Sequence, residues 1–139
     1  MKPDELMIGD WVFYEDRWFA APCKVVNIEQ RRGVGENGYS FSVHEPRSNT
    51  IVHCTILKPI LLTAEILEKN SFVLIDEKEK MYRLNLTDDE SVCVTADFKG
   101  EEPFVHVRNT CYQATPYCMY VHQLQHALRL CGIEMKIEL

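Results

Sequence analysis

The first 58 residues alternate short apolar runs with turn signals, and this alternation limits the possible folds more than any other feature of the sequence. Runs of aromatic and β-branched residues are typical of strands. Such runs, most of them bounded by Gly, Pro, Asn or Asp, fall at 11–14, 18–20, 23–28, 39–44 and 51–56. Several short strands in so few residues indicate a small barrel or a strongly bent sheet. We therefore expect residues 1–58 to form an SH3-like small β-barrel.

A short helix is expected to connect this barrel to the rest of the chain. Thr63 is a suitable N-cap for a helix over 64–69, and Asn70 is expected to take the left-handed conformation at its end. Further strands are expected in an antiparallel β-meander, at 72–75, 81–84, 91–96 and 103–107.

The last helix has the clearest pattern of all the expected elements. Its apolar stripe recurs at helical spacing and consists of Val121, Leu124, Leu128 and Cys131. Gly132 is its natural end, and its start lies between 115 and 120. The sequence thus predicts an α+β protein whose second part is 59–139. The two parts are expected to share one core, because each alone would be marginally stable.

The charge of the chain argues against a general affinity for nucleic acid. The formal net charge is −6, whereas phosphate contacts need an excess of Lys and Arg. Residues 17–58 are an exception, with six basic residues against three Glu. A nucleic-acid-binding module built on Arg31, Arg32 and Arg47 is therefore an alternative, with the rings of Trp18, Tyr39 and Phe41 as stacking surfaces. We favour the interpretation that these rings form the barrel core, as aromatic residues in short strands usually do.

The cysteines and the first residues indicate the cellular compartment. Residues 1–6 lack the apolar run of a signal peptide, and no stretch has the roughly 18 apolar residues of a membrane span. The six cysteines include no C-x-x-C pair. We expect a cytoplasmic protein that does not interact with membranes, with free thiols that pack as small apolar residues.

Residues 33–38 (GVGENG) match the pattern G-x-G-x-x-G of dinucleotide-binding loops. In those sites the last glycine opens a helix that faces the pyrophosphate. Here a strand pattern follows instead, at 39–43. We therefore expect an ordinary loop and no bound cofactor.

A metal site is a further alternative. Cys118, His122 and His126 are spaced four residues apart, which places them on one stripe of the last helix. Three residues over two turns span about 11 Å, however, so one ion cannot reach all three easily. Gln123 also replaces the general base of an H-E-x-x-H protease motif. A polar flank of an amphipathic helix is the favoured interpretation. The pairs Cys54–His53 and Cys118–His122 have no neighbour that would activate the thiol.

Three segments resemble one protein family when taken together. They are Leu6–Val12 (LMIGDWV), Pro59–Phe72 (PILLTAEILEKNSF) and Tyr120–Leu128 (YVHQLQHAL). They are similar to the motifs L-R-I-G-N/D-x-V, P-I-P-L-T-E-E-x-L-x-K-x-G-F and Y-V-H-Q-L-Q-N/H-x-L of small uncharacterised proteins common in phage- and mobile-element-rich genomes of gut bacteria. The chain departs from these motifs at Leu62, where Pro is usual, and at Ser71, where Gly is usual. The resemblance implies a cytoplasmic setting and an accessory role, without an activity.

The resemblance also draws attention to His122, Gln123 and Gln125 of the last helix. These side chains either form an interaction face or bond to backbone groups and serve the fold. We expect a non-enzymatic binding or adaptor protein encoded by a phage or mobile element, with an unidentified protein partner and an undetermined oligomeric state. Its possible interaction surface comprises Arg31, Arg32, Arg47, His122, Gln123 and Gln125.

Overall fold

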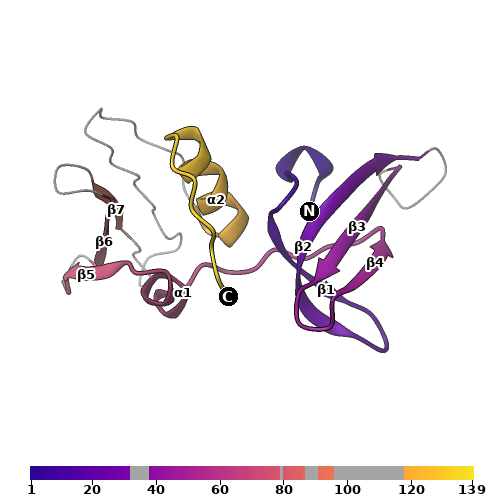
Figure 1. Cartoon of the computed structure of the whole chain (residues 1–139), viewed down its shortest axis with the longest axis horizontal. Helices are drawn as coiled ribbons and strands as arrows, with labels where there is room; N and C mark the ends of the chain where they lie inside the picture. Colours follow the sequence, from indigo (N-terminus) through magenta and orange to yellow (C-terminus); the bar gives the residue numbers. More distant parts are fainter. Residues whose placement is uncertain (32–37, 79, 87–90, 96–117) are drawn as a thin grey trace. The chain divides into compact units, whose positions relative to one another are not determined.

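The computed structural model describes residues 1–31, 38–78, 80–86, 91–95 and 118–139. The chain divides into two compact units, Met1–Ile60 and Leu61–Leu139. The first unit contains a 3-10 turn (Pro3–Glu5) and the strands β1 (Trp11–Glu15), β2 (Ala20–Gln30), β3 (Tyr39–Glu45) and β4 (Thr50–Cys54). The second contains α1 (Ala64–Lys69), β5 (Val73–Asp76), β6 (Met81–Asn85), β7 (Ser91–Thr95) and α2 (Val121–Leu130). The described chain is therefore α+β (Figure 1).

The strands of the first unit form one antiparallel sheet in the order β1-β2-β3-β4. A bulge between Val25 and Asn27 bends β2, the longest strand. After β4 the chain returns to β1, where Phe13 and Lys58 exchange two backbone hydrogen bonds of 2.8 and 2.9 Å. The described strands form a bent sheet with this single bridge and not a closed barrel.

The core of the first unit comes from β1, β2, β3 and two flanking segments, through the side chains of Leu6, Val12, Tyr14, Cys23, Val25, Phe41, Val43 and Leu57. The turn Met7–Asp10 leads into this core. Gly9 has a φ of 89°, which favours glycine, and its N–H bonds to the Val25 carbonyl at 2.7 Å. The buried Asp10 accepts a hydrogen bond from the Met7 N–H at 2.7 Å. Gly9 and Asp10 therefore each have a structural role in this turn.

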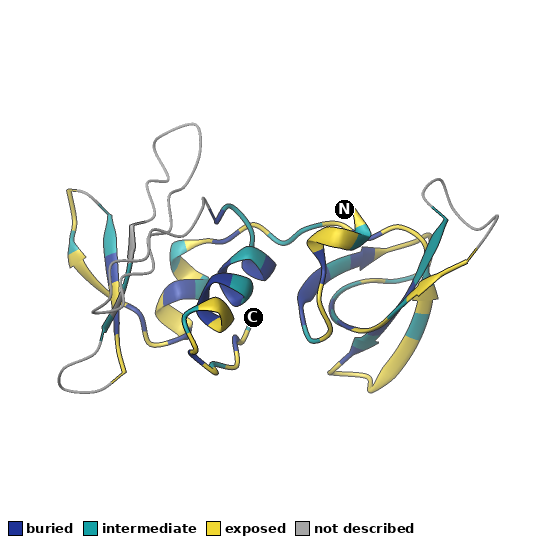
Figure 2. Ribbon diagram, turned by 90° about the horizontal axis from the view of Figure 1, so that it is seen from above, coloured by how far each residue is buried: buried dark blue, intermediate teal, exposed yellow. Residues whose placement is uncertain are grey.

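The second unit contains the antiparallel sheet β5-β6-β7 and the two helices. Most of α2 is buried (Figure 2). Leu61 and Tyr120 pair as a short antiparallel bridge, and the Leu62 N–H bonds to the Met119 carbonyl at 3.0 Å. The segment before α1 is thus joined to the segment before α2. The predicted strand at 103–107 lies outside the described residues, and the shared core of the two parts stays a prediction.

Both helices end in the same hydrogen-bond pattern, a Schellman motif. In α1 the N–H of Phe72 bonds to Leu67 and that of Ser71 to Glu68. Gly132 takes the corresponding place after α2, with a φ of 74°. The left-handed residue after α1 is Ser71, with a φ of 66°, so the prediction of a left-handed Asn70 is wrong.

Asn70 has a different task, because its buried side chain holds the C-terminal segment. Its Nδ2 donates to the carbonyls of Ile66 (2.8 Å) and Glu138 (2.7 Å), and its Oδ1 accepts from the Glu138 N–H at 2.8 Å. Lys69 also donates to the Leu139 carbonyl. Near this clamp, Ile137 is only 1% exposed. The Asn70 side chain therefore joins the end of α1 to Glu138, 68 positions later in the chain.

Candidate interaction site

Gln123 is bonded to the backbone of its own helix. Its Oε1 accepts hydrogen bonds from the N–H groups of Met119 (2.8 Å) and Tyr120 (3.1 Å). Both groups precede α2 and lie in the segment that pairs with Leu61 and Leu62. Gln123 thus fixes the start of the helix, as the third residue of a helix often does. The Gln123 side chain therefore bonds to backbone groups and has a structural role.

Two further polar residues of α2, His122 and Gln125, lie largely inside the unit. His122 is 3% exposed and Gln125 is 7% exposed. The His122 ring stacks on Tyr120 with centroids 5.7 Å apart and meets the edge of His126 at 5.9 Å. His122 and Gln125 therefore offer little polar surface to a partner, whereas Gln123 and His126 are partly open to solvent.

The residues of the metal alternative do not assemble into a site. Among the described residues, no three His, Cys, Asp or Glu side chains are grouped so that they could hold a metal ion. Burial raises the pKa of Cys118 to about 12, so its thiol is protonated at neutral pH and is a poor ligand or nucleophile. Burial likewise raises the pKa of Cys23 and of Cys54 to about 11. The five cysteines that the structure describes are free thiols; Cys111 lies outside the described residues.

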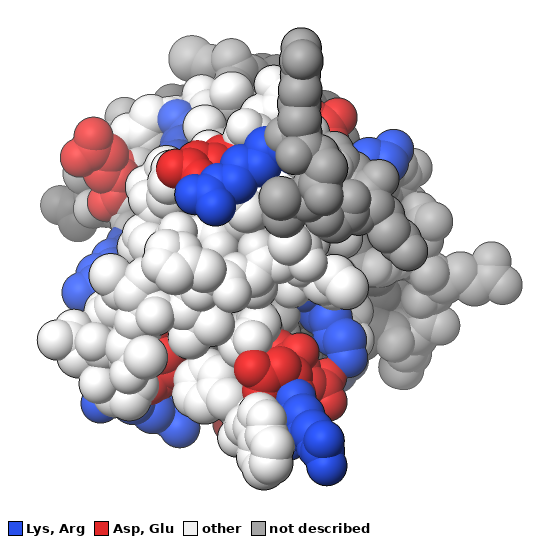
Figure 3. All heavy atoms as spheres, turned by 90° about the vertical axis from the view of Figure 1, so that its right-hand side faces the viewer, with Lys and Arg blue, Asp and Glu red and all other residues white. Residues whose placement is uncertain are grey.

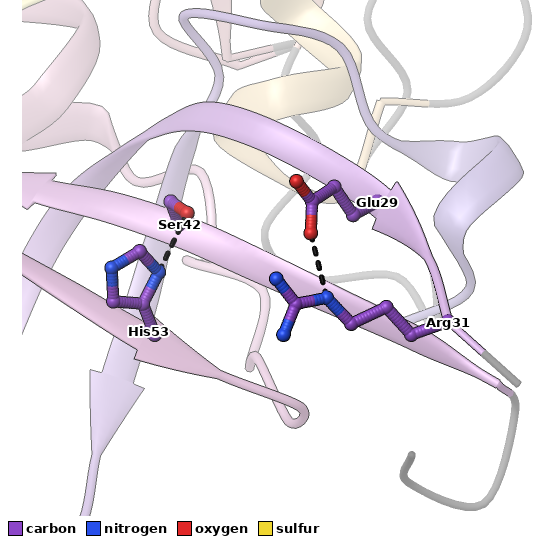
Figure 4. Close-up of polar contacts among 4 residues, drawn as sticks. All are labelled: Glu29, Arg31, Ser42 and His53. Carbon is purple, nitrogen blue, oxygen red and sulfur yellow. Dashed lines mark hydrogen bonds and ion pairs between the residues drawn. The ribbon is translucent and has the colours of Figure 1, made fainter. Parts of the chain in front are cut away.

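The sheet places Arg31 and Arg47, the two described arginines of the nucleic-acid alternative, at opposite ends. Arg31 follows the last residue of β2 and forms an ion pair with Glu29 at 2.8 Å (Figure 4). Arg47 lies in the β3–β4 turn, which closes the opposite end of the antiparallel sheet. Arg32 and most of the predicted 33–38 loop lie outside the described residues. On the face in Figure 3, basic and acidic side chains lie next to each other around an uncharged surface, which gives a nucleic acid no continuous basic path.

A serine and a histidine meet on the same sheet. Ser42 and His53 are partners across β3 and β4, and Ser42 Oγ lies 2.9 Å from His53 Nδ1 (Figure 4). His44 and Asn49 make a similar contact of 2.9 Å near the turn. Cross-strand neighbours of this kind usually stabilise a sheet.

The three rings considered as stacking surfaces for a nucleic acid have different environments. Phe41 lies in the core, and Tyr39 packs against it from a half-buried position. Trp18 is 84% exposed. The prediction that these rings form the core is therefore wrong for Trp18, and the prediction of a strand at 18–20 is wrong for its first two residues, because β2 begins at Ala20.

Trp18 is held in a turn between β1 and β2, which we call the tryptophan turn (residues 16–19). Asp16 Oδ1 accepts the N–H groups of Trp18 (2.7 Å) and Phe19 (2.8 Å), and Asp16 Oδ2 accepts the Tyr14 O–H at 2.6 Å. The ring of Phe19 turns inward and meets Tyr14 at 5.9 Å between centroids. The turn is thus fixed to the core on one side of Trp18, while the indole ring lies in solvent.

The hydrogen bonds of the turn also affect the acid–base behaviour of its residues. The Tyr14 O–H and the two backbone N–H groups hold the pKa of Asp16 below its usual value. The hydrogen bond to Asp16, together with burial, raises the pKa of Tyr14 to about 12. Both directions favour a charged Asp16 and a neutral Tyr14 at neutral pH, which is the state in which all three bonds form.

No protein-family model, curated protein or solved structure matches this chain. Neither helix among the described residues combines the length and the apolar character that are needed to cross a bilayer. A possible function must therefore be argued from the arrangement of the residues themselves. The tryptophan turn combines a backbone held by hydrogen bonds with an exposed aromatic ring.

Proposed function

We propose that this protein is a non-enzymatic binding or adaptor module that contacts a protein partner through the tryptophan turn. The observation that carries the proposal is Trp18, which is 84% exposed in a turn whose backbone is held by one carboxylate. Trp is among the residues that contribute most to binding energy at interfaces. A turn that is already ordered loses little conformational entropy when it binds.

We also propose an SH3-like arrangement for the first unit. The order β1-β2-β3-β4 and the return of Lys58 to the free edge of β1 support it. The origin in a phage or mobile element rests on the resemblance of the three sequence motifs, two of which contact each other at Leu61 and Tyr120.

Site-specific crosslinking tests the proposed binding surface. Ala20 is exposed and adjoins the tryptophan turn, so Ala20→p-benzoylphenylalanine places a photoreactive group beside an intact Trp18. The matched control carries the same group at Arg129, an exposed residue of α2. In extracts of the cells that produce the protein, we expect one identifiable protein to crosslink at position 20 and not at 129.

Adding Trp18→Ala to the position-20 variant is expected to remove the crosslink. The purified partner should then bind the wild-type protein and not the Trp18→Ala variant. Equal crosslinking at both positions, or a crosslink that survives Trp18→Ala, would contradict the proposal.

A further inference from the structure

We propose that the surface that receives the tryptophan turn is an apolar pocket bordered by carboxylates. This inference rests on the proposed function and specifies the chemistry of the partner. On this protein, the apolar part of the contact is the Trp18 ring, most of whose surface is not covered by any described residue. A large flat ring loses little rotamer entropy on burial and requires an apolar cavity of matching shape.

The charged component comes from two arginines at the same end of the sheet. The guanidinium of Arg17 lies 5.0 Å from the centroid of the Trp18 ring, and Arg17 is exposed. Arg47 is exposed in the β3–β4 turn. Because β1, β2, β3 and β4 are antiparallel neighbours, the β1–β2 and β3–β4 turns close the same end of the sheet, as Figure 1 also shows. Arg17 therefore lies beside the indole ring, and Arg47 lies at the same end of the sheet.

The acidic residues at this end are already engaged within the unit. Asp16 accepts three hydrogen bonds inside the tryptophan turn. Glu15 is paired with Lys58. Glu45 is 4% exposed and accepts the backbone N–H groups of Arg47 and Ser48. Glu15 and Asp16 are exposed as well, but their carboxylates are bonded within the unit, whereas Arg17 and Arg47 form no ion pair with a described residue. A carboxylate is the complementary group for these two arginines on a protein partner.

A nucleic acid fits this end of the sheet less well. A single strand needs a series of stacking rings and a basic groove along its backbone. Trp18 is the one aromatic side chain at the described turns that is mostly exposed. The next exposed arginine, Arg31, lies beyond the eleven residues of β2, about 35 Å further along the chain, and is paired with Glu29.

Cyclodextrins of one cavity size and different charge test this chemistry without a known partner. β-Cyclodextrin, its carboxymethyl derivative and its amino derivative are titrated into the protein, and the indole N–H signal of Trp18 is followed by NMR. The buried Trp11 serves as an internal control, since its indole signal should not move. We expect the carboxymethyl ring to bind about three- to tenfold more tightly than the neutral ring, and the amino ring more weakly than either. The preference should decrease as salt is added.

Matched variants identify the groups responsible. The double change Arg17→Gln and Arg47→Gln should remove the preference for carboxylates, whereas Arg31→Gln should keep it. Equal binding of the three cyclodextrins would overturn the inference, as would an equal loss of the carboxylate preference in Arg31→Gln. The crosslink at position 20 could still support the proposed function in either case. A single-stranded oligonucleotide that binds Trp18 more tightly than the carboxymethyl ring would also overturn it. If no ring shifts the Trp18 signal, the indole is not accessible, and both proposals fall.

Discussion

Trp18 in the tryptophan turn and Gln123 in the first turn of α2 have roles opposite to those that their residue types suggest. Gln123 is a polar residue on an amphipathic helix, yet its side-chain oxygen is used by two backbone N–H groups of the same unit. Trp18 is a large apolar residue in a β-rich region, yet it is 84% exposed. The Gln123 oxygen already has its hydrogen-bond partners within the fold. Most of the Trp18 ring is instead available to another molecule.

The largest effect is expected at Asn70, where a polar side chain is used entirely within the fold. Asn70→Ala removes three hydrogen bonds and leaves the Glu138 backbone groups without their partner, so we expect a loss of about 2–3 kcal/mol in the free energy of unfolding. Asn70→Asp keeps the shape but points a carboxylate at two carbonyls, and should be at least as harmful. Urea denaturation of each variant measures the effect. Unchanged midpoints for both variants would show that the clamp does not form.

Gln123 gives the next effect and separates a structural side chain from an interface residue. Gln123→Ala removes the acceptor of two backbone N–H groups at the start of α2, which should cost about 1 kcal/mol. Gln123→Glu keeps an acceptor at the positive end of the helix and should retain the stability or raise it slightly. Thermal unfolding of the two variants tests this expectation. If Gln123→Ala unfolds like the wild-type protein, the side chain is free for another role.

The C-terminal ends of α1 and α2 can be tested as a pair, because both form a Schellman motif. The left-handed residue is Ser71 after α1 and Gly132 after α2. Ser71→Gly should stabilise the protein and Gly132→Ala should destabilise it, each by about 0.5–1 kcal/mol, since both positions have a φ near 70°. A Cβ at Gly132 would meet no atom within 4 Å, so the cost there is conformational. Calorimetric unfolding compares the two variants, and shifts of the same sign would contradict the shared motif.

Acid should loosen the tryptophan turn. The pKa of Asp16 is lowered in the folded state, so its contribution to stability is present above the usual carboxyl pKa of about 3.9 and is lost as the pH falls through the lower folded value. The amide N–H signals of Trp18 and Phe19 in NMR spectra should move together in that range. Asp16→Asn should remove this step, because the amide does not titrate. A step that persists in this variant would assign the titration to another group.

The sequence predicts the elements better than it predicts the exposure of particular side chains. The strands of the first unit and the apolar stripe of α2 are visible as local patterns, and the structure has β1–β4 and α2 close to the expected ranges. The same patterns cannot assign Trp18, because Trp18-Phe19-Ala20 resembles the start of a strand. The hydrogen bonds that Asp16 accepts from the N–H groups of Trp18 and Phe19 hold these residues in a turn, and β2 begins at Ala20.

Long-range contacts are the other part that the sequence could not provide. The clamp between Asn70 and Glu138 joins residues 68 positions apart, and nothing in the local pattern of either segment indicates the other. For the tryptophan turn a local signal did exist: an Asp two residues before Trp18 is able to accept its N–H, a common arrangement in turns. That signal predicts a turn but not which ring lies in solvent, because Phe19 of the same turn packs against the core.

The affinity of the cross-linked partner for three proteins tests the central claim most directly. Calorimetry with wild-type protein, Trp18→Ala and Gln123→Glu should show that Trp18→Ala weakens binding by at least about 30-fold while Gln123→Glu leaves it unchanged. Trp18→Ala should also unfold within about 0.5 kcal/mol of the wild-type protein, because an exposed ring contributes little to stability. Wild-type affinity in Trp18→Ala, or a comparable loss in Gln123→Glu, would contradict the assignment of binding to the tryptophan turn.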